Sequence, residues 1–226
     1  MRIEPVGDAA AIVILGDVID LSTVRRVWAL NALLRERLGA SALDVVPAYA
    51  SVLVRFDPAA TNLAHVMACL RGAVQDSGDA ISLTPRRILV AACFGGEHGA
   101  DLEKIATAAD LTPARFVKGF CAAEYRVAFL GFIAGFPYLM GLPDELAVPR
   151  LATPRDRVPA GSVGIAGAQC GIYPRASPGG WRLIGQTKAA IFDTAHEPAA
   201  LFAPGDVVRF EPVTSLDAAI AEVSWS

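Results

Sequence analysis

Residues 125–187 decide the fold, and they read YRVAFLGFIAGFPYLMGLPDELAVPRLATPRDRVPAGSVGIAGAQCGIYPRASPGGWRLIGQT. Glycine and proline recur every few residues, yet the stretch keeps large aromatic and branched apolar side chains, which disordered linkers lack. Helical periodicity disappears here, and short strand-like runs alternate with glycine and proline turns as far as Phe210. The pattern predicts a closed or nearly closed β-barrel, in which backbone approaches backbone or a ligand at the glycines.

The residues before this stretch mix strand-like and helical segments. Helical spacing of apolar residues appears at 21–38 and 62–74. Short apolar runs typical of strands lie at 11–15, 43–48, 51–56 and 88–93. The resulting order, β-α-β-β-α-β, is that of a ferredoxin-like split unit, although an unrelated α+β arrangement would use the same elements.

Two more helices are expected between this unit and the barrel strands, at 101–109 and 113–122. Thr112 is a suitable N-cap for the second one, and Pro113 fits its first helical position. The tail, 215–221, is compatible with a short helix. We therefore expect an α+β chain with a small N-terminal domain, residues 1–86, and a β-barrel domain, residues 87–226.

Composition excludes several classes of function. The chain has 226 residues, 54% of them hydrophobic, and a net charge of −3, so nothing electrostatic favours nucleic acid or an anionic membrane as a partner. The N-terminus shows no basic region followed by an apolar run, and the longest uncharged run, 127–143, is too short for a membrane span. The four cysteines form no CxxC pair, which favours reduced thiols in a cytoplasmic protein.

The familiar cofactor and metal motifs are missing from the sequence. Glycines at 161, 164 and 167 are spaced as GxxGxxG with no helix expected after them, which differs from a dinucleotide fingerprint. No GxxxxGK[ST] phosphate loop and no GxSxG elbow occurs. The three histidines are scattered, so no metal site is expected.

Candidate binding residues lie in the loops of the barrel. Arg150 and Arg155 follow prolines, and an arginine on a short rigid loop suits a carboxylate or phosphate. The competing interpretation is solvated surface charge or pairing with nearby acids. Gln169 lies in an expected strand between Gly167 and Gly171, where its amide would bind a substrate amide or be satisfied within the core.

Aromatic residues and a glycine loop complete the candidates. The segment from Ser177 to Trp181 places exposable backbone amides of Gly179 and Gly180 beside a large aromatic ring, which suits an anion nest or a partner anchor, unless it only covers the barrel end. Phe136, Tyr138 and Tyr173 would form either core packing or the apolar floor of a pocket.

Four motifs resemble the family of the 5-oxoprolinase B subunit, also called KipI or allophanate hydrolase subunit 1. They are GFxxGFPYLxGLP (131–143), PRxxxPRxxVPAGSVGIAG (149–167), QxGIYPxxSPGGWxLIGxT (169–187) and PGDxVRF (204–210). The resemblance implies a small α+β domain followed by a cyclophilin-like β-barrel. It also implies a hydrolase component that acts with the A and C subunits of 5-oxoprolinase to open 5-oxoproline to glutamate, with hydrolysis of ATP in the assembled complex.

Within that resemblance, roles are assigned as hypotheses. Oxyanion stabilisation would come from Gln169 or the amides of Gly179 and Gly180. The substrate-binding residues would be Arg150, Arg155, Phe136, Tyr138, Tyr173, Ser177 and Trp181. An alternative function is a regulatory protein that inhibits a sensor histidine kinase, and a prolyl isomerase is suggested only by barrel analogy. Phe120 and Cys121 depart from the family, which usually has histidine and then serine or threonine there.

Overall fold

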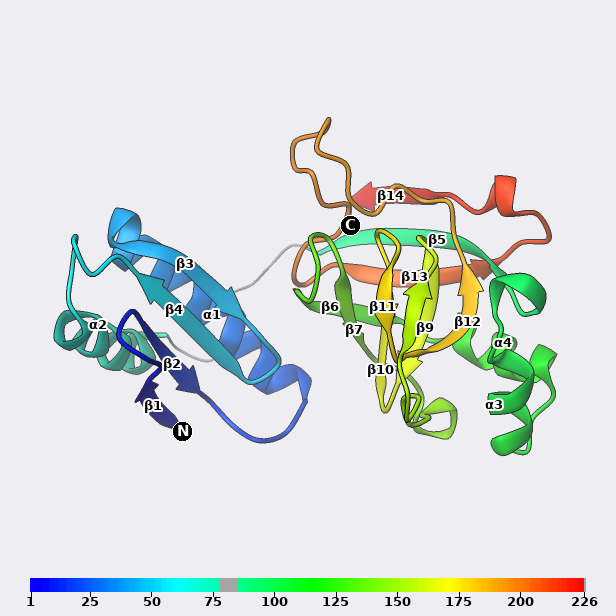
Figure 1. The fold of residues 1–226 in the computed structure, drawn as a ribbon, viewed down its shortest axis with the longest axis horizontal. Helices are drawn as coiled ribbons and strands as arrows, with labels where there is room; N and C mark the ends of the chain where they lie inside the picture. The colour runs from blue at the N-terminus through cyan, green and yellow to red at the C-terminus, as the bar shows by residue number, and fades with distance from the viewer. Residues whose placement is uncertain (78–84, 226) are drawn as a thin grey trace. The chain divides into compact units, whose positions relative to one another are not determined.

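The computed structural model describes residues 1–77 and 85–225 of the chain. The chain divides into two compact units, Met1–Leu83 and Thr84–Ser226, whose helices and strands are drawn in Figure 1. Each unit has buried apolar residues of its own. One unit combines a small sheet with two helices, and the other combines a β-barrel with two helices. The expected α+β class and the β-barrel are therefore confirmed.

The N-terminal unit is a four-stranded antiparallel sheet in the order β1-β2-β4-β3. Its strands are β1 (Arg2–Pro5), β2 (Ala10–Ile14), β3 (Ala42–Pro47) and β4 (Ser51–Phe56). Alternate residues of β2 and β4, together with Val45 of β3, are buried against two helices, α1 (Leu21–Leu38) and α2 (Leu63–Asp76), in one core cluster. A short 3-10 turn, η1 (Gly39–Ser41), follows α1.

Local capping explains where these helices begin. The Asp20 carboxylate accepts a hydrogen bond from the backbone amide of Thr23, and the Asn62 side chain does the same for His65. Both side chains satisfy amides that the first helical turn leaves without a partner.

The ferredoxin-like arrangement is not confirmed. The strand expected to complete it, 88–93, belongs to β5 (Arg86–Phe94), which pairs with barrel strands and not with the N-terminal sheet. Ile88, Val90 and Ala92 of this strand are buried in the barrel core. The outer position beside β2 is held by β1, a strand too short and too polar to stand out in the sequence.

The second unit closes seven strands into a barrel in the order β12-β9-β10-β7-β6-β13-β5, because β12 pairs again with β5. The strands after β5 are β6 (Tyr125–Leu130), β7 (Pro137–Met140), β9 (Ser162–Ala166), β10 (Gln169–Ile172), β12 (Arg182–Gln186) and β13 (Val207–Pro212). A separate two-stranded sheet joins β8 (Arg155–Val158) to β11 (Ser177–Gly179). The expected helix at 215–221 is wrong: a 3-10 turn, η4 (Leu216–Ala218), leads into β14 (Ala221–Trp225), which pairs with β5.

Two helices lie together at one end of the barrel, α3 (Leu102–Ala108) and α4 (Pro113–Ala122) (Figure 1). Thr112 caps α4 and Pro113 occupies its first turn, as the sequence predicts. Shorter turns are η2 (Gly96–His98) and η3 (Asp144–Leu146).

None of the helices in the described ranges has both the length and the apolar character needed to cross a bilayer.

Candidate functional site

A cavity of about 320 Å³ lies on the barrel unit, beside the turn between β6 and β7, and we call it the aromatic pocket. Its size is at the lower end of the range for small-molecule sites. The lining residues come from loops and strands of the barrel unit: Phe132, Phe136, Tyr138, Arg150, Pro154, Gln169, Tyr173, Pro178, Gly179, Gly180 and Trp181. The structure thus brings together every predicted site residue except Arg155 and Ser177.

The walls of the pocket are aromatic rings packed edge to face. The ring centroid of Phe136 lies 5.1 Å from those of Tyr138 and Tyr173 and 5.3 Å from that of Trp181, with the planes 62° to 89° apart. This is a preferred arrangement for aromatic rings, since the positive edge of one faces the negative face of another. Of the aromatic residues predicted as a pocket floor, Phe136 and Tyr173 are therefore packed and almost fully buried, while Tyr138 is half-buried at the lining.

Glycines make room for these rings. A Cβ atom on Gly171 would lie 2.7 Å from the Phe136 ring and 2.8 Å from the Pro137 carbonyl oxygen. On Gly179 it would lie 2.4 Å from the Tyr173 hydroxyl. No side chain fits at such distances without displacing its neighbours. The recurrence of glycine in the sequence thus has a packing cause, which is the close approach of aromatic rings to bare backbone.

Arg150 brings a positive charge to the pocket. Its loop is fixed on both sides, because Gly167 donates its amide to the Val148 carbonyl at 2.6 Å and Leu151 donates to the Gly180 carbonyl at 2.7 Å. Within residues 1–77 and 85–225, the Arg150 guanidinium has no hydrogen bond or ion pair with another residue. It is the one charged side chain that lines this pocket in the described structure, so the site favours an anion.

Neutral polar groups accompany this charge. Burial raises the pKa of Tyr138 and of Tyr173, and the Arg150 charge partly offsets the effect on both. Both phenols therefore stay protonated at neutral pH. The Trp181 backbone amide has a smaller, opposing effect and lowers the pKa of Tyr173. Gln169, at the start of β10, contributes a side-chain amide to the lining.

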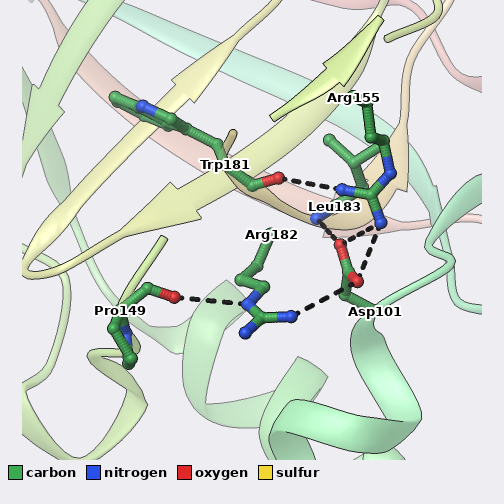
Figure 2. Close-up of polar contacts among 6 residues, drawn as sticks. All are labelled: Asp101, Pro149, Arg155, Trp181, Arg182 and Leu183. Carbon is green, nitrogen blue, oxygen red and sulfur yellow. Dashed lines mark hydrogen bonds and ion pairs between the residues drawn. The ribbon is translucent and has the colours of Figure 1, made fainter. Parts of the chain in front are cut away.

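Arg155 lies outside the pocket lining and is held by an acid. Its Nη2 atom donates to both carboxylate oxygens of Asp101 at 2.9 Å, and its Nη1 atom donates to the Trp181 carbonyl at 3.3 Å (Figure 2). Asp101 also accepts the Leu183 amide at 2.7 Å and lies 3.8 Å from Nη1 of Arg182. Arg155 thus binds the Trp181 carbonyl directly and is paired with an acid 54 residues away that also binds the Leu183 amide.

Ser177 and the neighbouring glycines have different positions. The Ser177 hydroxyl is buried, with no hydrogen-bond partner in the described part of the chain, and it does not line the pocket. Gly179 and Gly180 do line it, and the carbonyl of Gly180 accepts from Leu151. Three lining residues were missed by the sequence analysis: Phe132, Pro154 and Pro178. The signal for Phe132 is its place between Gly131 and Gly135, which marks it as the tip of a tight turn.

A larger hollow of about 790 Å³ lies beside α3 and α4. Its walls are mainly apolar, with Glu103, Lys118 and Glu211 among them. Cys121 lines it, and burial, with a smaller effect from Glu211, raises the pKa of this thiol to about 12, so it stays protonated and weakly nucleophilic. Phe120 is fully buried and lines neither cavity.

The arrangement as a whole suits recognition of a small, partly apolar anion. Among the described residues it offers one unpaired cation, one side-chain amide, two phenols and aromatic walls. No group of three or more histidine, cysteine, aspartate or glutamate side chains in the described ranges converges as a metal ion would require.

Comparison with known proteins identifies the family. The family model "Carboxyltransferase domain, subdomain C and D" matches residues 1–202. The 5-oxoprolinase B subunit of Haemophilus influenzae is 40% identical over 217 residues, which are 93% of this chain and 97% of that protein. The 5-oxoprolinase B subunit of Bacillus subtilis is 33% identical over 226 residues, 96% of this chain and 94% of that protein.

Solved structures agree with this assignment. The crystal structure of TTHA0988 matches with a TM-score of 0.80 and 33% identity over 92% of this chain, which spans only 40% of that longer chain. The urea carboxylase of Kluyveromyces lactis has a TM-score of 0.81 over 96% of this chain and 23% of its own length, but at 20% identity it shows the fold alone. Together with the family model and the curated relatives, these matches show that the chain belongs to the family of the 5-oxoprolinase B subunit.

Proposed function

We propose that this chain is part of an ATP-dependent 5-oxoprolinase, acts with the A and C subunits of that enzyme, and holds the lactam substrate in the aromatic pocket. One observation supports the pocket assignment above the others. The Arg150 guanidinium, unpaired within the described residues, and the side-chain amide of Gln169 line one small cavity with aromatic walls. The relatives named as the B subunit of 5-oxoprolinase support the class of reaction.

Each group has a chemical role in this proposal. 5-Oxoproline is a five-membered lactam with a carboxylate, so Arg150 pairs with the carboxylate through charge-assisted hydrogen bonds. Gln169 presents both a donor and an acceptor to the lactam amide. The rings of Phe136 and Trp181 pack on the carbon atoms of the ring and exclude water from it. Tyr138 and Tyr173, as protonated phenols, are hydrogen-bond donors to substrate oxygens.

The reaction breaks the lactam C–N bond and adds water at the carbonyl carbon, which gives glutamate. A lactam is a stable amide, and in the assembled complex ATP would activate its carbonyl oxygen by phosphorylation, with release of ADP and, after water attacks the carbonyl carbon, of phosphate. The backbone amides of Gly179 and Gly180 are the donors we propose for the negative charge on the phosphorylated carbonyl group. Because the activated substrate must stay shielded from bulk water until attack, we propose that the chain is inactive alone. We also propose that the complex acts in the cytoplasm.

Reconstitution tests this function. The A and C subunits are combined with the chain, and 5-oxoproline-dependent release of ADP is followed with each component omitted in turn. We expect activity to vanish when this chain is left out. Activity that persists without it would overturn the proposal and favour the regulatory alternative, inhibition of a sensor kinase.

Arg150→Ala locates the carboxylate site within the active complex. We expect the KM for 5-oxoproline to rise about 10- to 100-fold, as for loss of a hydrogen bond to a charged group. Arg150→Lys should recover part of the affinity, since it keeps the charge but loses the bidentate geometry. Arg175→Ala is the matched control, because Arg175 is exposed and lies outside the pocket lining. Equal effects of the two alanine variants would remove Arg150 from the site.

A further inference from the structure

The turn between β6 and β7 holds an aromatic residue in a backbone conformation that suits glycine. Phe132 has a φ of 63°. The Ile133 amide donates to the Gly131 carbonyl at 2.7 Å, so Phe132 is the central residue of a γ-turn with positive φ, the rarer and more strained form. Asp110 is the other non-glycine residue with positive φ in the described ranges, and its short polar side chain is better tolerated there.

Core packing does not account for the ring of Phe132. The residue is 59% exposed, whereas Phe136 in the same turn is 1% exposed. Backbone hydrogen bonds from Gly131 to the Phe136 carbonyl and from Phe136 to the Ile133 carbonyl fix the turn without using the side chain. A glycine at this position would adopt the same backbone with no steric cost. The strain is therefore associated with an exposed aromatic ring.

The strained turn directs this ring to the aromatic pocket. Phe132 lines the cavity, and its ring is nearly perpendicular to those of Phe136 and Tyr173, with centroids 5.6 and 6.3 Å away and interplanar angles of 84° and 87°. Backbone strain of this kind is concentrated at binding and catalytic sites, where the surrounding structure holds it in place.

We propose that Phe132 is a specificity-determining residue, whose exposed ring covers a planar cyclic amide while Arg150 binds the carboxylate of the same molecule. This inference rests on the proposed function and adds a basis for selectivity. The substrate 5-oxoproline and the product glutamate both carry a carboxylate for Arg150. Only the closed lactam offers a compact ring with a flat amide against which an aromatic ring packs, so Phe132 distinguishes the ring from the open chain.

The test compares Phe132→Gly with Phe132→Tyr in the reconstituted complex. The measurements are the KM for 5-oxoproline, the inhibition constant of glutamate, and the thermal unfolding midpoint of the chain alone. For Phe132→Gly we expect a KM about tenfold higher, an inhibition constant for glutamate that is nearly unchanged, and a midpoint that is equal or higher because the turn relaxes. Phe132→Tyr keeps the ring and should keep the wild-type KM.

Other results would contradict either the role of Phe132 or the proposed function. An unchanged KM in Phe132→Gly, a parallel rise in KM and in the inhibition constant, a lower unfolding midpoint, or failure to assemble with the partner subunits would overturn the role of Phe132. An assembled wild-type complex that does not hydrolyse 5-oxoproline would overturn the proposed function itself. The two failures are thereby distinguished, because the first requires an active wild-type complex.

Discussion

Phe120 lies at the centre of an aromatic cluster in the barrel core. Its ring centroid is 4.8 Å from that of Phe210, 5.1 Å from that of Tyr125 and 5.8 Å from that of Phe94. The resemblance to the family implies a histidine here, whereas this chain has a phenylalanine that is fully buried and outside the aromatic pocket. A phenylalanine in place of that implied histidine carries no proton, and it leaves the proposed pocket intact.

Phe120→His should destabilise the chain in a pH-dependent way. A neutral imidazole among these rings leaves buried polar nitrogens without partners, at a cost of about 1–3 kcal/mol. Burial also lowers the pKa of the histidine below its unfolded value of about 6.5, so the unfolded state binds more protons as the pH falls. The free energy of unfolding should thus drop further between about pH 7 and pH 5.

Urea unfolding at both pH values checks this prediction, with Phe120→Leu as a control that opens space without adding a titratable group. The leucine variant should show the pH dependence of the wild type. A histidine variant that is as stable as the leucine variant at both pH values would mean that the imidazole finds a partner in the core.

At the scale of elements, the Asp101 carboxylate joins three segments that are distant in sequence. It lies at the start of α3 and is bound by Arg155 of β8 and by the Leu183 amide of β12. Its side chain is 8% exposed and that of Arg155 is 28% exposed. Because Arg155 also binds the Trp181 carbonyl, this network positions one wall of the aromatic pocket (Figure 2).

Asp101→Asn should weaken both the fold and the site. It leaves Arg155 without its charge partner in a partly buried position, and we expect a loss of about 2–4 kcal/mol in the free energy of unfolding. The KM for 5-oxoproline should rise in the reconstituted complex as Trp181 loses its anchor. Asp217→Asn is the matched control, since the Lys188–Asp217 pair is exposed and screened by solvent, so its loss should change the stability little. Similar losses in the two variants would contradict the role given to Asp101.

The same network shows what the sequence predicts and what it leaves open. Local signals were sufficient to predict α4, because its N-cap residue Thr112 directly precedes the helix. They were also sufficient to predict that the aromatic residues of 136–138 and 173–181 lie together. The partner of Arg155 was not predictable, because Asp101 precedes it by 54 residues and only the closed barrel brings them together. For the same reason β5 was assigned to the wrong sheet, since its parallel partner, β13, lies more than a hundred residues later.

For the whole molecule, we expect the two compact units, which share no core cluster, to differ in how their stability depends on pH. Buried groups with raised pKa are concentrated in the barrel unit. Burial raises the pKa of Tyr125, Tyr138, Tyr173, Cys93, Cys121 and Cys170 there, whereas in the N-terminal unit Cys69 is affected. A group with a raised folded pKa stabilises fully below its unfolded pKa, and the contribution is lost as the pH rises above that value.

The barrel unit should therefore lose stability between about pH 8.5 and pH 10.5, the range in which unfolded cysteine and tyrosine titrate, while the N-terminal unit changes less. Tryptophan fluorescence separates the two, because Trp28 lies in the N-terminal unit and Trp181 and Trp225 lie in the barrel unit. The Trp28→Phe variant keeps tryptophan in the barrel unit only, so its fluorescence in urea follows barrel unfolding. The double variant Trp181→Phe/Trp225→Phe keeps Trp28 only, so its fluorescence follows unfolding of the N-terminal unit. At pH 10 the barrel midpoint should fall below its value at pH 7 by more than the N-terminal midpoint does. Equal shifts of the two midpoints would show that the units unfold as one, and an unchanged barrel midpoint would show that its phenols and thiols ionise without unfolding.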